Sequence, residues 1–121
     1  MATGFDRATA RFIASCAHVT AVRDLVTKWR LELAGGYNLD LYFNETLGKY
    51  GYTLVQAGTR VLGWDNAPHH PGLANFPHHV HRPDGRIEPS TLTGDPDHDP
   101  STSSGHRLEQ VCLEVESFLA Q

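Results

Sequence analysis

An alternation of apolar and polar residues between positions 25 and 64 is the feature that most constrains how this sequence can fold. The alternation has a period of two and runs through four segments, which are separated by short connections that contain glycine. The segments are LVTKWRLEL (25–33), YNLDLYFNE (37–45), KYGYTLVQ (49–56) and TRVLGW (59–64). A period of two indicates half-buried strands, and connections this short favour an antiparallel meander of four strands.

Helical patterns flank the predicted sheet. Residues 1–18 and residues 105–121 each carry apolar side chains near helical spacing, as in a helix that packs one face against a core. The chain has 121 residues, and its hydrophobic content of 40% suffices for one modest core. We therefore expect a single α+β domain over residues 1–121, with the sheet over residues 20–64 and a helix at each end.

The overall charge gives no general attraction to polyanions. The formal net charge is −4 and the isoelectric point is near 6.0, so any binding to nucleic acid or to an anionic membrane surface must be local. No segment approaches the roughly 20 apolar residues that a membrane span needs, and charges interrupt the N-terminus where a secretory signal would be apolar. Cys16 and Cys112 form no C-x-x-C pair and are expected to be buried free thiols. These features predict a cytoplasmic protein without membrane association.

The segment WDNAPHHPGLANFPHHVHRPDG, from Trp64 to Gly85, breaks the alternation and cannot form a helix. It contains four prolines and five of the eight histidines of the chain, namely His69, His70, His78, His79 and His81. A structureless loop of this length is unusual in a compact domain. We therefore expect residues 64–88 to form an ordered site loop, and the Pro- and Ser-rich residues 89–104 to form a mobile linker.

A metal site is one interpretation of the histidine segment. If residues 79–81 are extended, His79 and His81 point to the same side, and His78 points away. Neutral imidazoles bind Zn²⁺ and similar ions, and Asp65 could supply an oxygen ligand. However, the segment lacks the paired helical or knuckle spacing that is typical of zinc signatures.

General acid–base catalysis without a metal is the second interpretation. Cleavage of RNA requires one group that removes the proton of the ribose 2′-OH and a second group that protonates the leaving 5′-oxygen, and two imidazoles can serve. A cation must stabilise the charge on the phosphate, for which the candidates are Lys49, Arg60 and Arg82. Tyr50 and Tyr52 could stack on a base, although their alternation on one strand face fits core packing equally well.

A purely structural role is the third interpretation of the histidine segment. Histidines can cap turns and bond to the backbone, while Pro68, Pro71 and Pro77 determine the path of the chain. For a single histidine this would be the default, but a cluster of one titratable residue type argues for site chemistry.

The block at residues 49–85 resembles the signature of the TumE family, which consists of small toxins encoded beside a helix-turn-helix antitoxin. The resemblance is carried by Y-x-Y at Tyr50 and Tyr52, by WDNAPHH at residues 64–70 and by PHHVH at residues 77–81. It extends through DGRIEPS at residues 84–90, and the layout of the family fits roughly residues 20–95.

The resemblance implies the toxin of a type II toxin–antitoxin pair that acts on RNA as a ribonuclease and is covered by its helix-turn-helix antitoxin. The positions expected to matter are Asp65, His69, His70, His78, His79 and His81, whereas His98 and His106 are assigned to the linker. Two alternatives stay open. The same histidines could form a zinc-type hydrolase, or the chain could be a non-enzymatic module that docks a partner protein through the stripe from Leu108 to Leu119.

Overall fold

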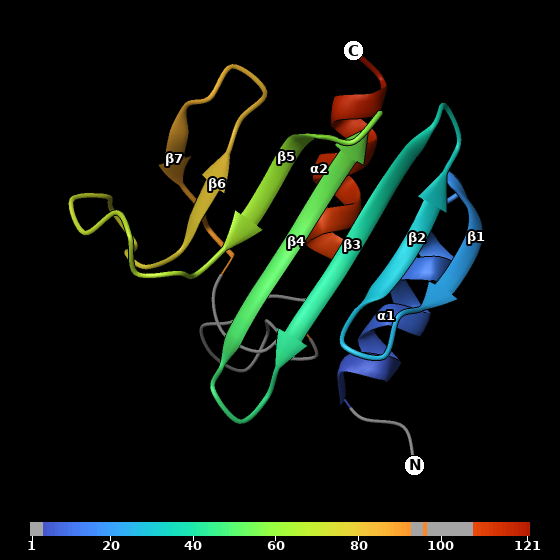
Figure 1. Ribbon diagram of the computed structural model, residues 1–121, viewed down its shortest axis with the longest axis horizontal. Coiled ribbons are helices and arrows are strands. Elements are labelled where there is room, and N and C mark those ends of the chain that lie inside the picture. The colour runs from blue at the N-terminus through green and yellow to red at the C-terminus, as the bar shows by residue number, and fades with distance from the viewer. Residues whose placement is uncertain (1–3, 93–95, 97–107) are drawn as a thin grey trace.

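Two helices cover one face of a seven-stranded antiparallel sheet in the computed structural model, and the other face is open (Figure 1). The structure describes residues 4–92, 96 and 108–121. Every strand pairs with the next one along the chain, so the sheet is a meander. The helices are α1 (Gly4–Ser15) and α2 (Glu109–Leu119), and the strands are β1 (Val19–Asp24), β2 (Trp29–Leu33), β3 (Tyr37–Asn44), β4 (Lys49–Gln56), β5 (Thr59–Asp65), β6 (His79–His81) and β7 (Ile87–Pro89).

The α+β class and the antiparallel meander are confirmed, but the prediction of four strands is wrong because the sheet has seven. The four predicted segments correspond to β2–β5. The first predicted strand, residues 25–33, is too long, because residues 25–28 form the turn between β1 and β2. In this turn the Leu25 amide donates to the Lys28 carbonyl at 2.9 Å. The alternation of apolar residues therefore continued by chance across a hairpin turn.

The three additional strands have weak sequence signals for physical reasons. Strand β1 is an edge strand and is half-buried at most, so it needs no regular apolar face. Strands β6 and β7 contain 3 residues each; β6 lies between Pro77 and Pro83, and β7 ends in Pro89. Because β6 pairs with β5, the predicted site loop over residues 64–88 is divided into an irregular loop at 66–78 and a β6–β7 hairpin. The sheet accordingly extends beyond residue 64, to Pro89.

The terminal helices lie within the predicted ranges, 1–18 and 105–121, and are shorter than predicted. The predicted linker over residues 89–104 begins as ordered chain, because Pro89 ends β7 and both Ser90 and Leu92 are buried. Residues 93–95 and 97–104, including His98, lie outside the described residues, as does His106. No helix of the described part has the length and apolar character that a bilayer span requires.

The hydrophobic core lies between the sheet and the two helices. Its largest fully buried side chain is Trp64 of β5, whose indole Nε1 donates to the carboxylate of Glu114 on α2. The predicted stripe from Leu108 to Leu119 faces the same core: Leu108, Val111, Cys112 and Val115 are buried in it, and Phe118 and Leu119 pack against it. The stripe is therefore not available as a docking face for a partner. The prediction that Cys16 and Cys112 are buried free thiols is confirmed.

Candidate active site on the open face of the sheet

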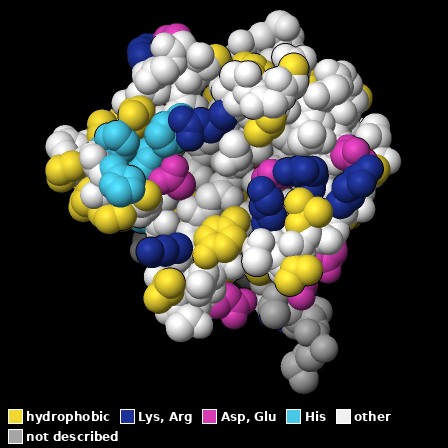
Figure 2. Space-filling model, in the orientation of Figure 1, with side chains coloured by type: hydrophobic (Ala, Val, Ile, Leu, Met, Phe, Trp, Pro, Cys, Tyr) yellow, Lys and Arg dark blue, Asp and Glu magenta, His cyan; other side chains and the backbone are white. Residues whose placement is uncertain are grey.

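A cluster of histidines lies on the open face, where β5 pairs with β6. Side chains alternate along a strand, so the neighbours of buried Trp64 and Val80 point away from the helices. The register places Asp65 directly opposite His79 and Gly63 directly opposite His81. Residues 79–81 are extended in β6, so the condition under which His79 and His81 share a face is met, and Figure 2 shows the histidines gathered at one side of this face.

The polar atoms of Asp65, His79 and His81 form a closed triangle, which we call the triad. Nε2 of His79 lies 3.0 Å from Oδ1 of Asp65, and Nε2 of His81 lies 3.2 Å from Oδ2. The two Nε2 atoms are 3.1 Å apart. The side chain of His79 is only 2% exposed, whereas those of His81 and Asp65 are 16% and 25% exposed. Solvent or a ligand therefore reaches the triad from the side of Asp65 and His81.

Contacts outside the triad determine which ring nitrogens carry protons. Nδ1 of His79 donates to the Pro77 carbonyl at 2.8 Å, because a carbonyl can only accept. Nη2 of Arg60 lies 3.3 Å from Nδ1 of His81, and a guanidinium can only donate. Nδ1 of His81 is therefore the acceptor, and the proton of its neutral ring is on Nε2, facing Asp65. The Ala67 amide donates to Oδ1 of Asp65 at 2.9 Å and holds this carboxylate in place.

The imidazole of His81 is neutral near neutral pH. Burial and the adjacent Arg60 guanidinium hold the pKa of His81 below its ordinary value of 6.5, although the Asp65 carboxylate favours the charged form. A neutral imidazole with a lone pair on Nδ1 can accept a proton.

The other loop histidines fall into three different environments. The ring of His70 meets the rings of His79 and His81 edge-on, with centroids 4.9 and 6.1 Å away, and is half-buried. His69 is exposed, and within the described part of the chain its side chain has no recorded hydrogen bond or ring contact. His78 points to the opposite face of the sheet, where its Nδ1 lies 2.8 Å from the hydroxyl of Tyr50. Only His70 therefore joins the triad.

Tyr50 and Tyr52 lie on the helix side of the sheet. Both are buried, and their rings stack at a centroid distance of 5.1 Å. The Tyr50 hydroxyl also donates to the Leu92 carbonyl at 3.3 Å, so it ties β4 to the segment after β7. The structure places the tyrosines away from the triad and in the core that supports it.

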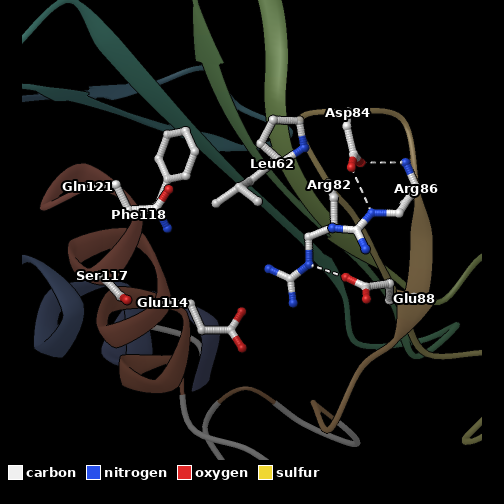
Figure 3. A pocket seen from close by; sticks show the side chains of 10 residues that line it. Leu62, Arg82, Asp84, Arg86, Glu88, Glu114, Ser117, Phe118 and Gln121 are labelled. Carbon is white, nitrogen blue, oxygen red and sulfur yellow. Dashed lines mark hydrogen bonds and ion pairs between the residues drawn. The ribbon is translucent and has the colours of Figure 1, made fainter.

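Arg82 also lies on the helix side. It points into a pocket of about 510 Å³ between the β6–β7 hairpin and α2, and donates to Glu88 at 2.6 Å (Figure 3). Arg86 in the same pocket donates to Asp84 at 2.7 Å. Both guanidiniums are thus paired with carboxylates, and the pocket is separated from the triad by the sheet.

Two of the predicted cations lie on the open face with the histidines. Alternation along β4 places Lys49 on this face, and the β-bulge that pairs Arg60 of β5 with Val55 places Arg60 there too. Further along, Lys28 and Arg30 donate to Asp40 at 2.9 and 2.8 Å. Figure 2 shows Lys and Arg side chains both beside the histidines and across the face from them. This face carries a local excess of positive charge, made up of Arg23, Lys28, Arg30, Lys49 and Arg60 against Glu32, Asp40 and Asp65.

A comparison with models of protein families matches residues 9–118 to the family described as Toxin TumE. The chain belongs to the TumE family. The resemblance seen at residues 49–85 is thereby confirmed over most of the chain, and a toxin family implies an antitoxin partner. Comparisons with curated proteins and with solved structures found no match.

Among the described residues of this TumE-family chain, two groups of side chains have donor atoms close enough for a metal ion. The ligand atoms of Asp65, His79 and His81 lie within 4.8 Å of one another. Their separations of 3.0 to 3.2 Å are near the roughly 3.3 Å expected between ligands of a tetrahedral zinc ion with bonds of about 2.0 Å. The second group, Cys16, Cys112 and Glu116, is less suitable because burial raises the pKa of the Cys112 thiol, whereas a metal requires the thiolate.

Sequence reasoning missed two glycines that adjoin the triad and a tyrosine, Tyr42, that lies one strand beyond Gly51. Gly51 is paired with Asp65 on one side and with Tyr42 on the other, and Gly63 is paired with His81. A glycine inside a strand was a possible signal, since such a residue weakens the strand and often marks a close approach.

Proposed function

We propose that this TumE-family chain is a toxin that cleaves RNA by general acid–base catalysis without a metal ion, with the triad and His70 as its catalytic centre. The observation that carries the proposal is the contact chain from Arg60 through His81 to Asp65. In this chain the neutral imidazole of His81 lies between two charged groups. Arg60 can bind a phosphate, and Asp65 can stabilise an imidazolium. The proposed partner is a helix-turn-helix antitoxin that covers the open face.

His81 is the proposed general base. When an RNA phosphate draws the exposed Arg60 side chain away, Nδ1 of His81 becomes free to accept the proton of the ribose 2′-OH. The 2′-oxygen then attacks phosphorus, and Asp65 stabilises the resulting imidazolium through Nε2, as the carboxylate does in serine protease triads. His79 is a positioning residue, because its own Nδ1 is committed to Pro77 and its Nε2 faces Asp65.

His70 is the proposed general acid. Its ring lies beside His81 and is more exposed than that of His79, so it can reach the 5′-oxygen on the far side of the phosphate. Protonation of this oxygen accompanies breakage of the bond between phosphorus and the 5′-oxygen. The products are a 2′,3′-cyclic phosphate and a 5′-hydroxyl, and Arg60 stabilises the charge on the phosphate in between.

The acidic limb of the pH profile tests the role of His81. The active form of His81 is neutral and its pKa is lowered, so the acidic limb of the kcat/KM profile should lie below pH 6.5. Replacing Arg60 with glutamine removes one cause of the lowered pKa, so the limb should move to higher pH. Arg86→Gln, on the other face of the sheet, should leave the limb in place. An acidic limb above neutral pH, or one that Arg60→Gln does not move, contradicts the assignment.

A zinc-type hydrolase is the second candidate function, and the near-tetrahedral separations in the triad favour it. The Arg60 contact argues for the metal-free centre. A metal bound at Nε2 of His81 would leave the ring proton on Nδ1, where it would face another donor. Elemental analysis of protein purified without chelators separates the two, because stoichiometric zinc supports the hydrolase and its absence supports the proposed ribonuclease.

A further inference from the structure

Two glycines, Gly51 and Gly63, leave an area without side chains on the open face beside the triad, which we call the floor. Gly51 lies between Asp65 and Tyr42 in one row across the sheet, and Gly63 lies between His81 and Thr53 in the next row. Neither glycine has a positive φ, so backbone conformation does not require glycine at these positions. Figure 2 shows a strip without charged side chains between the histidines and the basic side chains across the face.

The two glycines serve different purposes. A Cβ on Gly63 would lie 3.0 Å from Cδ of Arg60, so the missing side chain gives the Arg60 stem its path toward His81. A Cβ on Gly51 would have no atom within 4 Å, so neither packing nor conformation accounts for glycine there. A glycine that weakens a strand and borders open space marks a place where a ligand can approach the backbone.

We propose that Gly51 and Tyr42 form a subsite for the unpaired RNA base of the nucleotide whose 2′-OH is attacked. Tyr42 is two strands from Asp65, about 10 Å away, and Gly51 lies between them, so a nucleotide held at the triad can lay its base across Gly51 toward Tyr42. Its ring is half-buried on the open face, and no hydrogen bond of its hydroxyl is recorded within the described part of the chain. The base lies on Gly51 and stacks on Tyr42, as aromatic side chains bind single-stranded RNA.

Charge supports this occupant. Lys49 lies two residues from Gly51 on the same face of β4, and Arg60 crosses the face at Gly63, so cations bracket the floor. Phosphates on either side of a bound nucleotide would meet them. A base in a duplex could not lie flat on the sheet, so the subsite selects single-stranded RNA. This inference rests on the proposed function, because it places the substrate of the same centre.

Binding of a fluorescently labelled single-stranded RNA tests the subsite. All variants are made in the His81→Ala background, so that the RNA stays intact, and are compared at one salt concentration. Tyr42→Ala and Gly51→Leu should each weaken binding by about 10- to 100-fold, the loss expected for one stacked base. Tyr42→Phe retains the ring and should bind RNA as tightly as the protein that carries His81→Ala alone, which we call the parent. Asn38→Leu, which adds the same side chain elsewhere on this face, is the control for Gly51→Leu.

The outcomes separate the subsite from the proposed function. The side chain at position 51 has open space, so Gly51→Ala and Gly51→Leu should both fold, which their thermal unfolding verifies. If the parent binds RNA and wild-type protein cleaves it, but folded Tyr42→Ala and Gly51→Leu bind normally, the subsite is wrong and the ribonuclease stands. If the parent does not bind RNA and the wild-type protein does not cleave it, both are overturned.

Discussion

Replacing His81 with alanine should lower the single-turnover rate of RNA cleavage by about 10²- to 10⁴-fold, the usual contribution of a general base. The substitution removes Nδ1, the proposed acceptor of the 2′-OH proton, and also frees Arg60 and Asp65 from their contacts with the ring. His81 lies on the open face and not in the hydrophobic core, so the variant should stay folded. The rate is measured with protein in excess over single-stranded RNA, so that product release does not contribute.

The matched control is His69→Ala. His69 lies in the same loop, one residue before His70, but it is exposed, and no contact with the triad is recorded in the described part of the structure. Its replacement should leave the rate within a few-fold of wild type. Equal losses in the two variants, or a wild-type rate for folded His81→Ala, would place the chemistry elsewhere.

Replacing Trp64 with alanine should lower the free energy of unfolding by about 3–5 kcal/mol, as for other buried large-to-small substitutions. Trp64 is 1% exposed and joins β5 to α2 through the core and through the bond from its indole to Glu114. For a small domain with about 5–15 kcal/mol of total stability, this loss is large. Urea denaturation followed by circular dichroism measures it.

Trp29→Ala is the control for this stability prediction. Trp29 also donates through its Nε1, to Asp6 at 3.3 Å, but its side chain is only half-buried, so its loss should cost less than that of Trp64. An unfolding free energy of Trp64→Ala within about 1 kcal/mol of wild type would show that β5 is not held to α2 through this residue.

The sequence predicted the parts of the fold in which one face of a strand is buried. The alternation in YNLDLYFNE and KYGYTLVQ identified β3 and β4 because each strand has a core face and an open face. The same signal was misleading in LVTKWRLEL, where exposed Val26 lies at the tip of a turn with a φ of 73°. The edge strand β1 and the short β6 and β7 bury too few alternating side chains to be visible in the sequence.

The candidate site could be predicted only to the level of the segment. The cluster of histidines and the alternation in HVH indicated that His79 and His81 share a face and that His78 does not. The sequence could not show that β6 pairs with β5 in the register that places Asp65 opposite His79. The separate pairing of β4 with β5 leaves Gly51 beside the triad, and the alternation along β4 turns Tyr50 and Tyr52 toward the core.

The ends of the RNA fragments produced in excess EDTA test the central claim most directly. Purified wild-type protein is incubated with single-stranded RNA and EDTA, and the fragments are analysed by mass spectrometry. If the 2′-oxygen attacks with His81 as base, each cleavage should give one fragment that ends in a 2′,3′-cyclic phosphate and one that begins with a 5′-hydroxyl. Cleavage that stops in EDTA and resumes with zinc, giving 3′-hydroxyl and 5′-phosphate ends, would contradict the metal-free acid–base centre.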